Sequence, residues 1–203
     1  MPGFPLRKAD TMTLLILGLV LFLGVHSVRI VAEGWRAQLR ARVGEGAWKG
    51  IYTLLSIAGF VLIVYGYGLA RQQPVVLWAS PLWTRHLAAL LTVPAIVLLV
   101  AAYVPGNSLK AKLHHPMVLG TKLWALAHLI ANNTLADLLL FGSFLLWASL
   151  DFRAARQRDR ALGTVYAAGR TGPTVVTVVV GIVAWAAFAF WAHEKLIGVR
   201  PFG

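Results

Sequence analysis

The chain has 203 residues, of which 59% are apolar and 13% charged, and its formal net charge is +12. This composition is typical of a helical integral membrane protein, and the absence of cysteine excludes disulfides, thiolate metal ligands and a thiol nucleophile. Because the basic residues lie in short segments between apolar runs, as membrane topology requires, nucleic-acid binding is not expected.

Six apolar stretches predict an all-α, polytopic transmembrane bundle in a lipid bilayer, formed as a single domain over residues 1–203. The first stretch is too long for a signal peptide and lacks a small-residue cleavage site at its end. The third contains Pro94, which neighbouring helices can accommodate. The predicted spans are residues 12–32, 50–70, 85–104, 116–131, 134–150 and 173–193.

The stretch 115–150 is apolar almost throughout, and it contains an interruption. As a single helix it would be about 50 Å long, well beyond the ~30 Å hydrocarbon core. The Asn-Asn pair at 132–133 can end one helix, and Thr134 with Asp137 has the spacing of a capping box that starts another. We therefore expect a short helical hairpin over residues 116–150.

The positions of lysine and arginine distinguish this arrangement from one with five spans. With six spans the odd-numbered loops carry twelve basic residues and the opposite side six, whereas five spans divide them nine against nine. We therefore expect six spans, with both termini outside and the basic loops in the cytoplasm. The twelve are Arg29, Arg36, Arg40, Arg42, Lys49, Lys110, Lys112, Arg153, Arg156, Arg158, Arg160 and Arg170, and the six are Arg7, Lys8, Arg71, Arg85, Lys195 and Arg200.

Histidines are the strongest functional signal. His26 and His128 lie inside predicted spans, where an ionisable residue indicates a functional site by default. The sequence has no HExxH motif, paired carboxylates or phosphate loop, so hydrolytic and phosphoryl chemistry are not expected. Imidazoles within a membrane indicate haem, because a neutral imidazole is an ordinary axial ligand of its iron. His86 and His193 lie at span ends, where we expect interfacial side chains.

Helix geometry limits which histidines can share one iron. His115 and His128 are thirteen residues apart, about 19 Å along a helix, and therefore cannot do so. A second ligand must come from another helix, and His26 is the candidate in the first span. Arg29 follows it one turn later on the same face, where it can pair with a haem propionate.

Two sequence elements carry a family resemblance, namely His26-Ser-Val-Arg29 in the first span and the later series His115, Pro116, Gly120, Trp124, His128 and Asn132. Together they resemble the NnrU family of bacterial membrane proteins, which is similar to plant and cyanobacterial 15-cis-ζ-carotene isomerase. The resemblance covers nearly the whole chain. It implies a multi-pass protein of the bacterial inner (cytoplasmic) membrane that binds b-type haem.

The resemblance also implies roles for individual residues. In the isomerase two histidines hold the haem iron, and a redox-linked change of ligation exposes that iron to a polyene double bond. The corresponding residues here are His26 and His128, as metal ligands and catalytic residues. A further important histidine corresponds to His115, and the cofactor-binding candidates are His26, Arg29, His115, Trp124, His128 and Asn132.

The expected depth of the histidines leaves two ligand pairs open. In the six-span arrangement His26 lies toward the cytoplasmic end of its helix, whereas His128 is one turn from the outer Asn-Asn turn. For upright helices this mismatch is on the order of 10–15 Å. A re-entrant or strongly tilted hairpin would remove it. With upright helices, His115 matches His26 better in depth.

Three functional hypotheses follow. The first is a redox-gated cis–trans isomerase of a linear polyene such as 15-cis-ζ-carotene. The second is a non-catalytic membrane haem protein that supports denitrification, with nitric oxide reductase or an electron donor as its partner, because the NnrU family is associated with nitric oxide reductase function. The third is a structural or transport protein without a cofactor.

Overall fold

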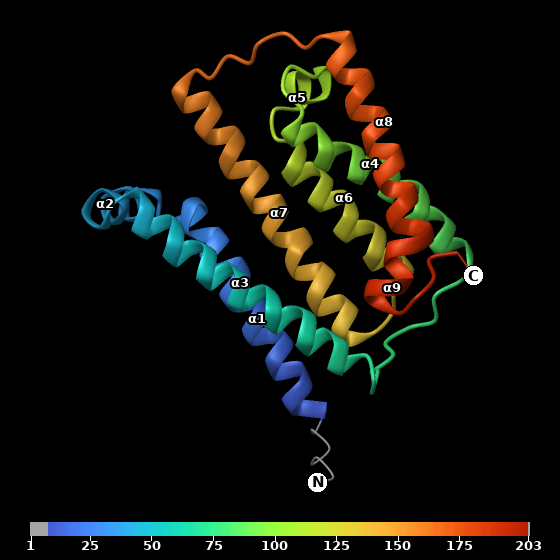
Figure 1. Cartoon of the computed structure of the whole chain (residues 1–203). Coiled ribbons are helices and arrows are strands. Elements are labelled where there is room, and N and C mark those ends of the chain that lie inside the picture. The colour runs from blue at the N-terminus through green and yellow to red at the C-terminus, as the bar shows by residue number, and fades with distance from the viewer. Residues whose placement is uncertain (1–7, 203) are drawn as a thin grey trace. The chain divides into compact units, whose positions relative to one another are not determined.

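The computed structural model describes residues 8–202, a range that contains helices and no strand (Figure 1). The predicted all-α class is therefore confirmed. Arg7, counted above for topology, lies outside this range. The helices are α1 (Lys8–Val31), α2 (Glu33–Val43), α3 (Glu45–Ala70), α4 (Trp83–Tyr103), α5 (Ser108–Leu113), α6 (Pro116–Ala131), α7 (Leu135–Leu162), α8 (Thr171–Ala187), the π-helix η1 (Phe188–Ala192) and α9 (His193–Ile197).

Each predicted span coincides with a helical stretch. Five stretches of the described chain are long and apolar enough to cross a membrane, whereas α6 has only 16 residues. Several helical segments were not predicted, among them the short helix α5. The polar α2 follows α1 almost directly, and α7 continues from the predicted end at residue 150 to Leu162. Alanine, arginine and glutamine have high helix propensity, so this polar extension stays helical.

The chain forms two compact units. Unit 1 contains the residues up to Trp78 together with Thr134–Ser143, and unit 2 contains Ala79–Asn133 together with Phe144–Gly203. Each unit is described by itself below.

Unit 1 is built on an antiparallel pair of helices, α1 and α3, that pack through glycine (Figure 1). A Cβ atom at Gly66 would lie 2.5 Å from the backbone nitrogen of Leu15, and one at Gly59 would lie 2.7 Å from that of Phe22. Residues later in α1 thus contact residues earlier in α3, as in an antiparallel pair. Lipid tails are as apolar as leucine, so such close backbone packing is an important source of helix association in a membrane.

The start of α7 belongs to unit 1 and contains the predicted capping box. The backbone N–H of Thr134 donates to the carboxylate of Asp137 at 3.0 Å, and the N–H of Asp137 donates to the Thr134 hydroxyl at 3.2 Å. The hydroxyl of Tyr67 on α3 donates to the other carboxylate oxygen at 2.5 Å. Asp137 is only 6% exposed, and these bonds offset the cost of burying its carboxylate.

In unit 2, α4 packs against both α6 and α8 through small residues. A Cβ atom at Gly120 of α6 would lie 2.8 Å from the carbonyl oxygen of Ala95, and one at Gly181 of α8 would lie 2.7 Å from the Cα of Val97. These contacts hold three helix backbones close together.

The remainder of the predicted hairpin is also visible within unit 2. The Trp124 ring lies edge-on to Phe144 with centroids 5.6 Å apart, and His115 lies edge-on to Phe152 at 6.2 Å. Earlier residues of α6 therefore meet later residues of α7, as antiparallel packing requires. The predicted helix–turn–helix over 116–150 is confirmed.

Gly66→Leu tests the packing of α1 against α3. The new side chain would overlap the α1 backbone, so we expect the free energy of unfolding to fall by about 1–3 kcal/mol. The matched control is Gly68→Leu on the same helix, where a Cβ meets nothing within 4 Å. The measurement is thermal unfolding of both variants in detergent. Equal melting temperatures for the two would contradict the proposed contact.

Candidate functional site

Unit 2 contains a cavity of about 540 Å³. It lies among α4, α6, α8, η1 and the C-terminal segment 199–202, with Phe144 of α7 in its wall. A volume of this size suits one small-molecule ligand or cofactor. Its aromatic residues are Trp124, Phe144, Trp185, Phe188 and Phe202, and its polar or charged residues are Ser80, Arg85, Thr92, Thr121, His128, Asn132, Asn133, His193 and Arg200.

One face of α6 brings three predicted site residues to this cavity. Trp124, His128 and Asn132 follow one another at intervals of four residues, which places them on the same side of a helix. The Nδ1 atom of His128 lies 2.8 Å from the carbonyl oxygen of Trp124, and the Asn132 amide donates to the His128 carbonyl at 2.9 Å. The side chain of His128 is therefore oriented by its own helix.

The hydrogen bond to Trp124 also determines the chemistry of the His128 ring. A carbonyl oxygen can only accept, so the hydrogen is on Nδ1 and the lone pair of the neutral ring is on Nε2. Metal-ligating histidines almost always donate their other ring N–H to a carbonyl, a carboxylate or water. His128 thus has the tautomer that an axial haem ligand requires.

In unit 1, His26 has the same local geometry. Its Nδ1 lies 2.7 Å from the carbonyl oxygen of Phe22, one turn earlier, and its ring stacks on Phe22 with centroids 4.2 Å apart. The ring of Tyr52 on α3 lies 5.2 Å away. Arg29 forms a 3.9 Å ion pair with Glu33, and both side chains are exposed.

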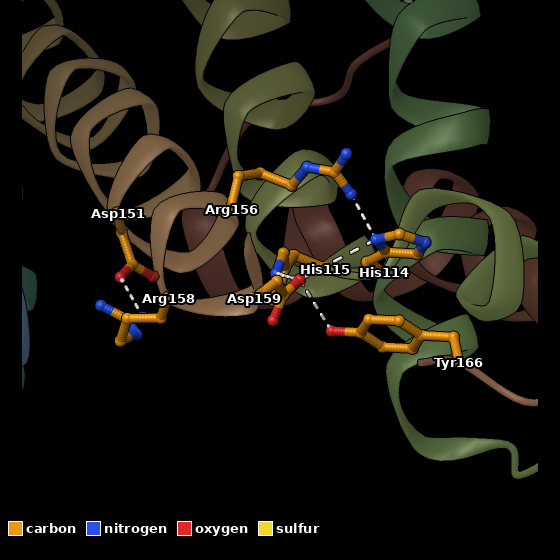
Figure 2. A network of polar contacts seen from close by, with 7 residues as sticks. All are labelled: His114, His115, Asp151, Arg156, Arg158, Asp159 and Tyr166. Carbon is orange, nitrogen blue, oxygen red and sulfur yellow. Dashed lines mark hydrogen bonds and ion pairs between the residues drawn. The ribbon is translucent and has the colours of Figure 1, made fainter. Parts of the chain in front are cut away.

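His115 is not part of the cavity lining and belongs to a separate polar cluster of unit 2 (Figure 2). Its Nε2 lies 2.8 Å from a carboxylate oxygen of Asp159, and the Tyr166 hydroxyl donates to the same oxygen at 3.1 Å. His114 stacks on Tyr166 with centroids 4.0 Å apart and contacts Arg156. These contacts join the start of α6 to the end of α7.

The cavity also contains residues that the sequence analysis did not identify. His193, expected at the membrane interface, lines the cavity together with Trp185, Arg85 and Arg200. Its Nδ1 lies 2.7 Å from the carbonyl oxygen of Val199. His193 directly follows η1, and π-helical turns within α-helices often occur at functional sites. No periodic pattern of the sequence indicates this turn.

A haem would require few donors from the protein. Within residues 8–202, no three histidine, aspartate or glutamate side chains gather into a group that could hold a metal ion. A porphyrin supplies four of the ligands to its iron, so the protein needs to add only one or two imidazoles.

A comparison with known protein families identifies the family of this chain. The family model described as NnrU protein matches residues 14–201. The chain belongs to the NnrU family. The match includes both sequence elements that carried the resemblance and extends through both units of this NnrU-family protein. No curated protein and no solved structure matches the sequence.

Tyr166→Phe tests the polar cluster through pH. Partial burial, and then the hydrogen bond to the Asp159 carboxylate, raise the pKa of Tyr166 above its ordinary value. Folding therefore favours the neutral phenol. The associated stability is fully present below the pKa of the unfolded chain, about 10, and is lost as pH rises through the folded-state pKa.

We therefore expect Tyr166→Phe to lose less stability than the unmodified protein as the pH rises above about 10. Denaturant unfolding in detergent at several alkaline pH values measures this difference. Tyr103→Phe is the control, since Tyr103 is 76% exposed. If the stability of the Tyr166→Phe variant and of the unmodified protein changed equally with pH, the hydrogen bond would contribute nothing to stability.

Proposed function

We propose that this NnrU-family protein of the bacterial inner membrane binds one haem b in the cavity of unit 2, with His128 as an axial ligand. The observation that carries the proposal is the His128 ring at the cavity wall, with Nδ1 bonded to Trp124 and its lone pair on Nε2. Aromatic side chains around the cavity provide flat surfaces for a porphyrin.

His26 is the second ligand that we propose, on the basis of the family resemblance. Its Nδ1 bond to Phe22 gives it the same tautomer as His128. His115 is the less favourable candidate, because its Nε2 is already hydrogen-bonded to Asp159 and would have to give up that bond. His193 is a further alternative to test. Its Nδ1 is hydrogen-bonded to a carbonyl, as in His26 and His128.

For activity we propose cis–trans isomerisation of a linear polyene. Bound haem would supply a redox-active iron centre that can polarise a double bond. The protein would contribute the orientation of the His128 ring and an apolar wall, which includes Ile96 and Leu99, that excludes water. An apolar wall of this kind suits a lipid-soluble substrate.

The alternative is a non-catalytic haem protein that supports nitric oxide reduction. One observation favours it: a cavity of about 540 Å³ is sized for one ligand rather than for a haem together with a long polyene. In this case the partner would be a nitric oxide reductase or an electron donor.

An absorption spectrum of the purified protein, with added haemin and with or without dithionite, tests haem binding. We expect a low-spin Soret and α/β pattern that His128→Ala converts to a high-spin or free-haem spectrum. The same loss in His26→Ala would support the proposed second ligand, and parallel His115→Ala and His193→Ala variants test the alternatives. His86→Ala is the control. A wild-type protein without any haem spectrum would overturn the proposal.

Expression in a carotenogenic bacterial host separates the two activities. An isomerase should convert 15-cis-ζ-carotene, and His128→Ala should abolish the conversion. Absence of conversion by a haem-loaded protein, together with loss of nitric oxide reduction when the protein is deleted, would select the non-catalytic role.

A further inference from the structure

The cavity of unit 2 has a polar end and an apolar end. Its α4 wall extends from Arg85 in the first turn of the helix to Leu99, fourteen residues later, or about 21 Å. Asn132, the C-cap residue of α6, also lines the cavity, and Ile96 and Leu99 near the end of α4 add apolar surface. An elongated cavity with this division matches an amphipathic ligand.

The charged side chains at the cavity indicate the charge of the ligand that it would bind. Arg85 and Arg200 are in the lining, and the described lining residues include no aspartate or glutamate. Within residues 8–202, Arg85 forms no ion pair. Arg200 forms one with Glu194 at 2.8 Å, and both side chains are substantially exposed, at 70% and 41%. An exposed ion pair contributes little free energy, so a ligand carboxylate can replace Glu194.

We propose that Arg85 and Arg200 bind the two carboxylates of a flat, amphipathic ligand whose apolar body occupies the cavity. The inference rests on the proposed function, in which these carboxylates are the haem propionates. Arginine suits this role because its planar guanidinium can bind a carboxylate through two parallel hydrogen bonds. A free fatty acid shares the carboxylate chemistry, and the experiment separates it from a porphyrin.

The probe is metal-free protoporphyrin IX compared with its dimethyl ester, because this pair isolates the carboxylates from iron ligation. Binding to the full chain in neutral detergent is followed by quenching of tryptophan fluorescence, since Trp124 and Trp185 line the cavity. We expect the wild-type protein to prefer the free acid. Arg85→Gln and Arg200→Gln should each reduce that preference by about tenfold or more, while the affinity for the ester stays unchanged.

Three further variants make the test specific. Glu194→Gln should strengthen binding of the free acid, since it removes the competing partner of Arg200. Lys195→Gln is the matched control, because it removes a neighbouring positive charge that is not in the cavity lining. His128→Ala should lose haemin ligation and keep the preference for the free acid, so failure of the proposed iron ligand is distinguishable from failure of the arginines.

The outcomes divide clearly. The inference would be overturned if the preference for the free acid persisted in Arg85→Gln and Arg200→Gln. It would also be overturned if that preference were lost only in Arg29→Gln. Displacement of the porphyrin by oleate at equal concentration would also overturn it, in favour of a fatty-acid site. Dependence on both cavity arginines, with Lys195→Gln unchanged and oleate ineffective, would support it.

Discussion

The hydrogen bond from the His128 ring to the Trp124 carbonyl is the interaction on which the candidate site depends. An imidazole inside an apolar helix needs partners for two nitrogens, and its own helix offers a carbonyl four residues earlier. Using that carbonyl orients the ring and leaves the lone pair on the other nitrogen. His26 forms the equivalent hydrogen bond to the carbonyl of Phe22, four residues earlier. A helix can thus present a metal-ligand tautomer without any help from a second helix.

Helix α4 shows how the cavity and the close packing coexist in unit 2. The cavity residues of this helix recur every three or four positions, from Arg85 through Thr92 to Leu99, and therefore occupy one face. Ala95 and Val97 make the close approaches to Gly120 and Gly181. Small residues bring the backbones together at these points, while larger side chains surround the cavity. The same helix both holds the unit together and forms a wall of the cavity.

Local patterns were sufficient to predict most helices, because apolar runs of about twenty residues and the Thr134–Asp137 capping box depend only on nearby sequence. Trp124, His128 and Asn132 were identified from the family resemblance, and all three line the cavity. The polar helix α2, the short helix α5, the long end of α7 and the π-turn were missed, since none has an apolar periodicity that marks it. Arg200 and His193 reach the cavity through the fold of the C-terminal segment, which no local pattern encodes.

The histidines near the two ends of α6 have different polar surroundings. At its start, His115 is engaged with Asp159, so that end already contains a carboxylate and its partners. His128 lies about 19 Å farther along the helix and lines a cavity whose charged residues are arginines. Asp159 therefore engages the imidazole at the first end, whereas the described cavity lining at the second includes arginines and no aspartate or glutamate. In the proposed complex, the arginines would orient the ligand by charge before any bond to an imidazole forms.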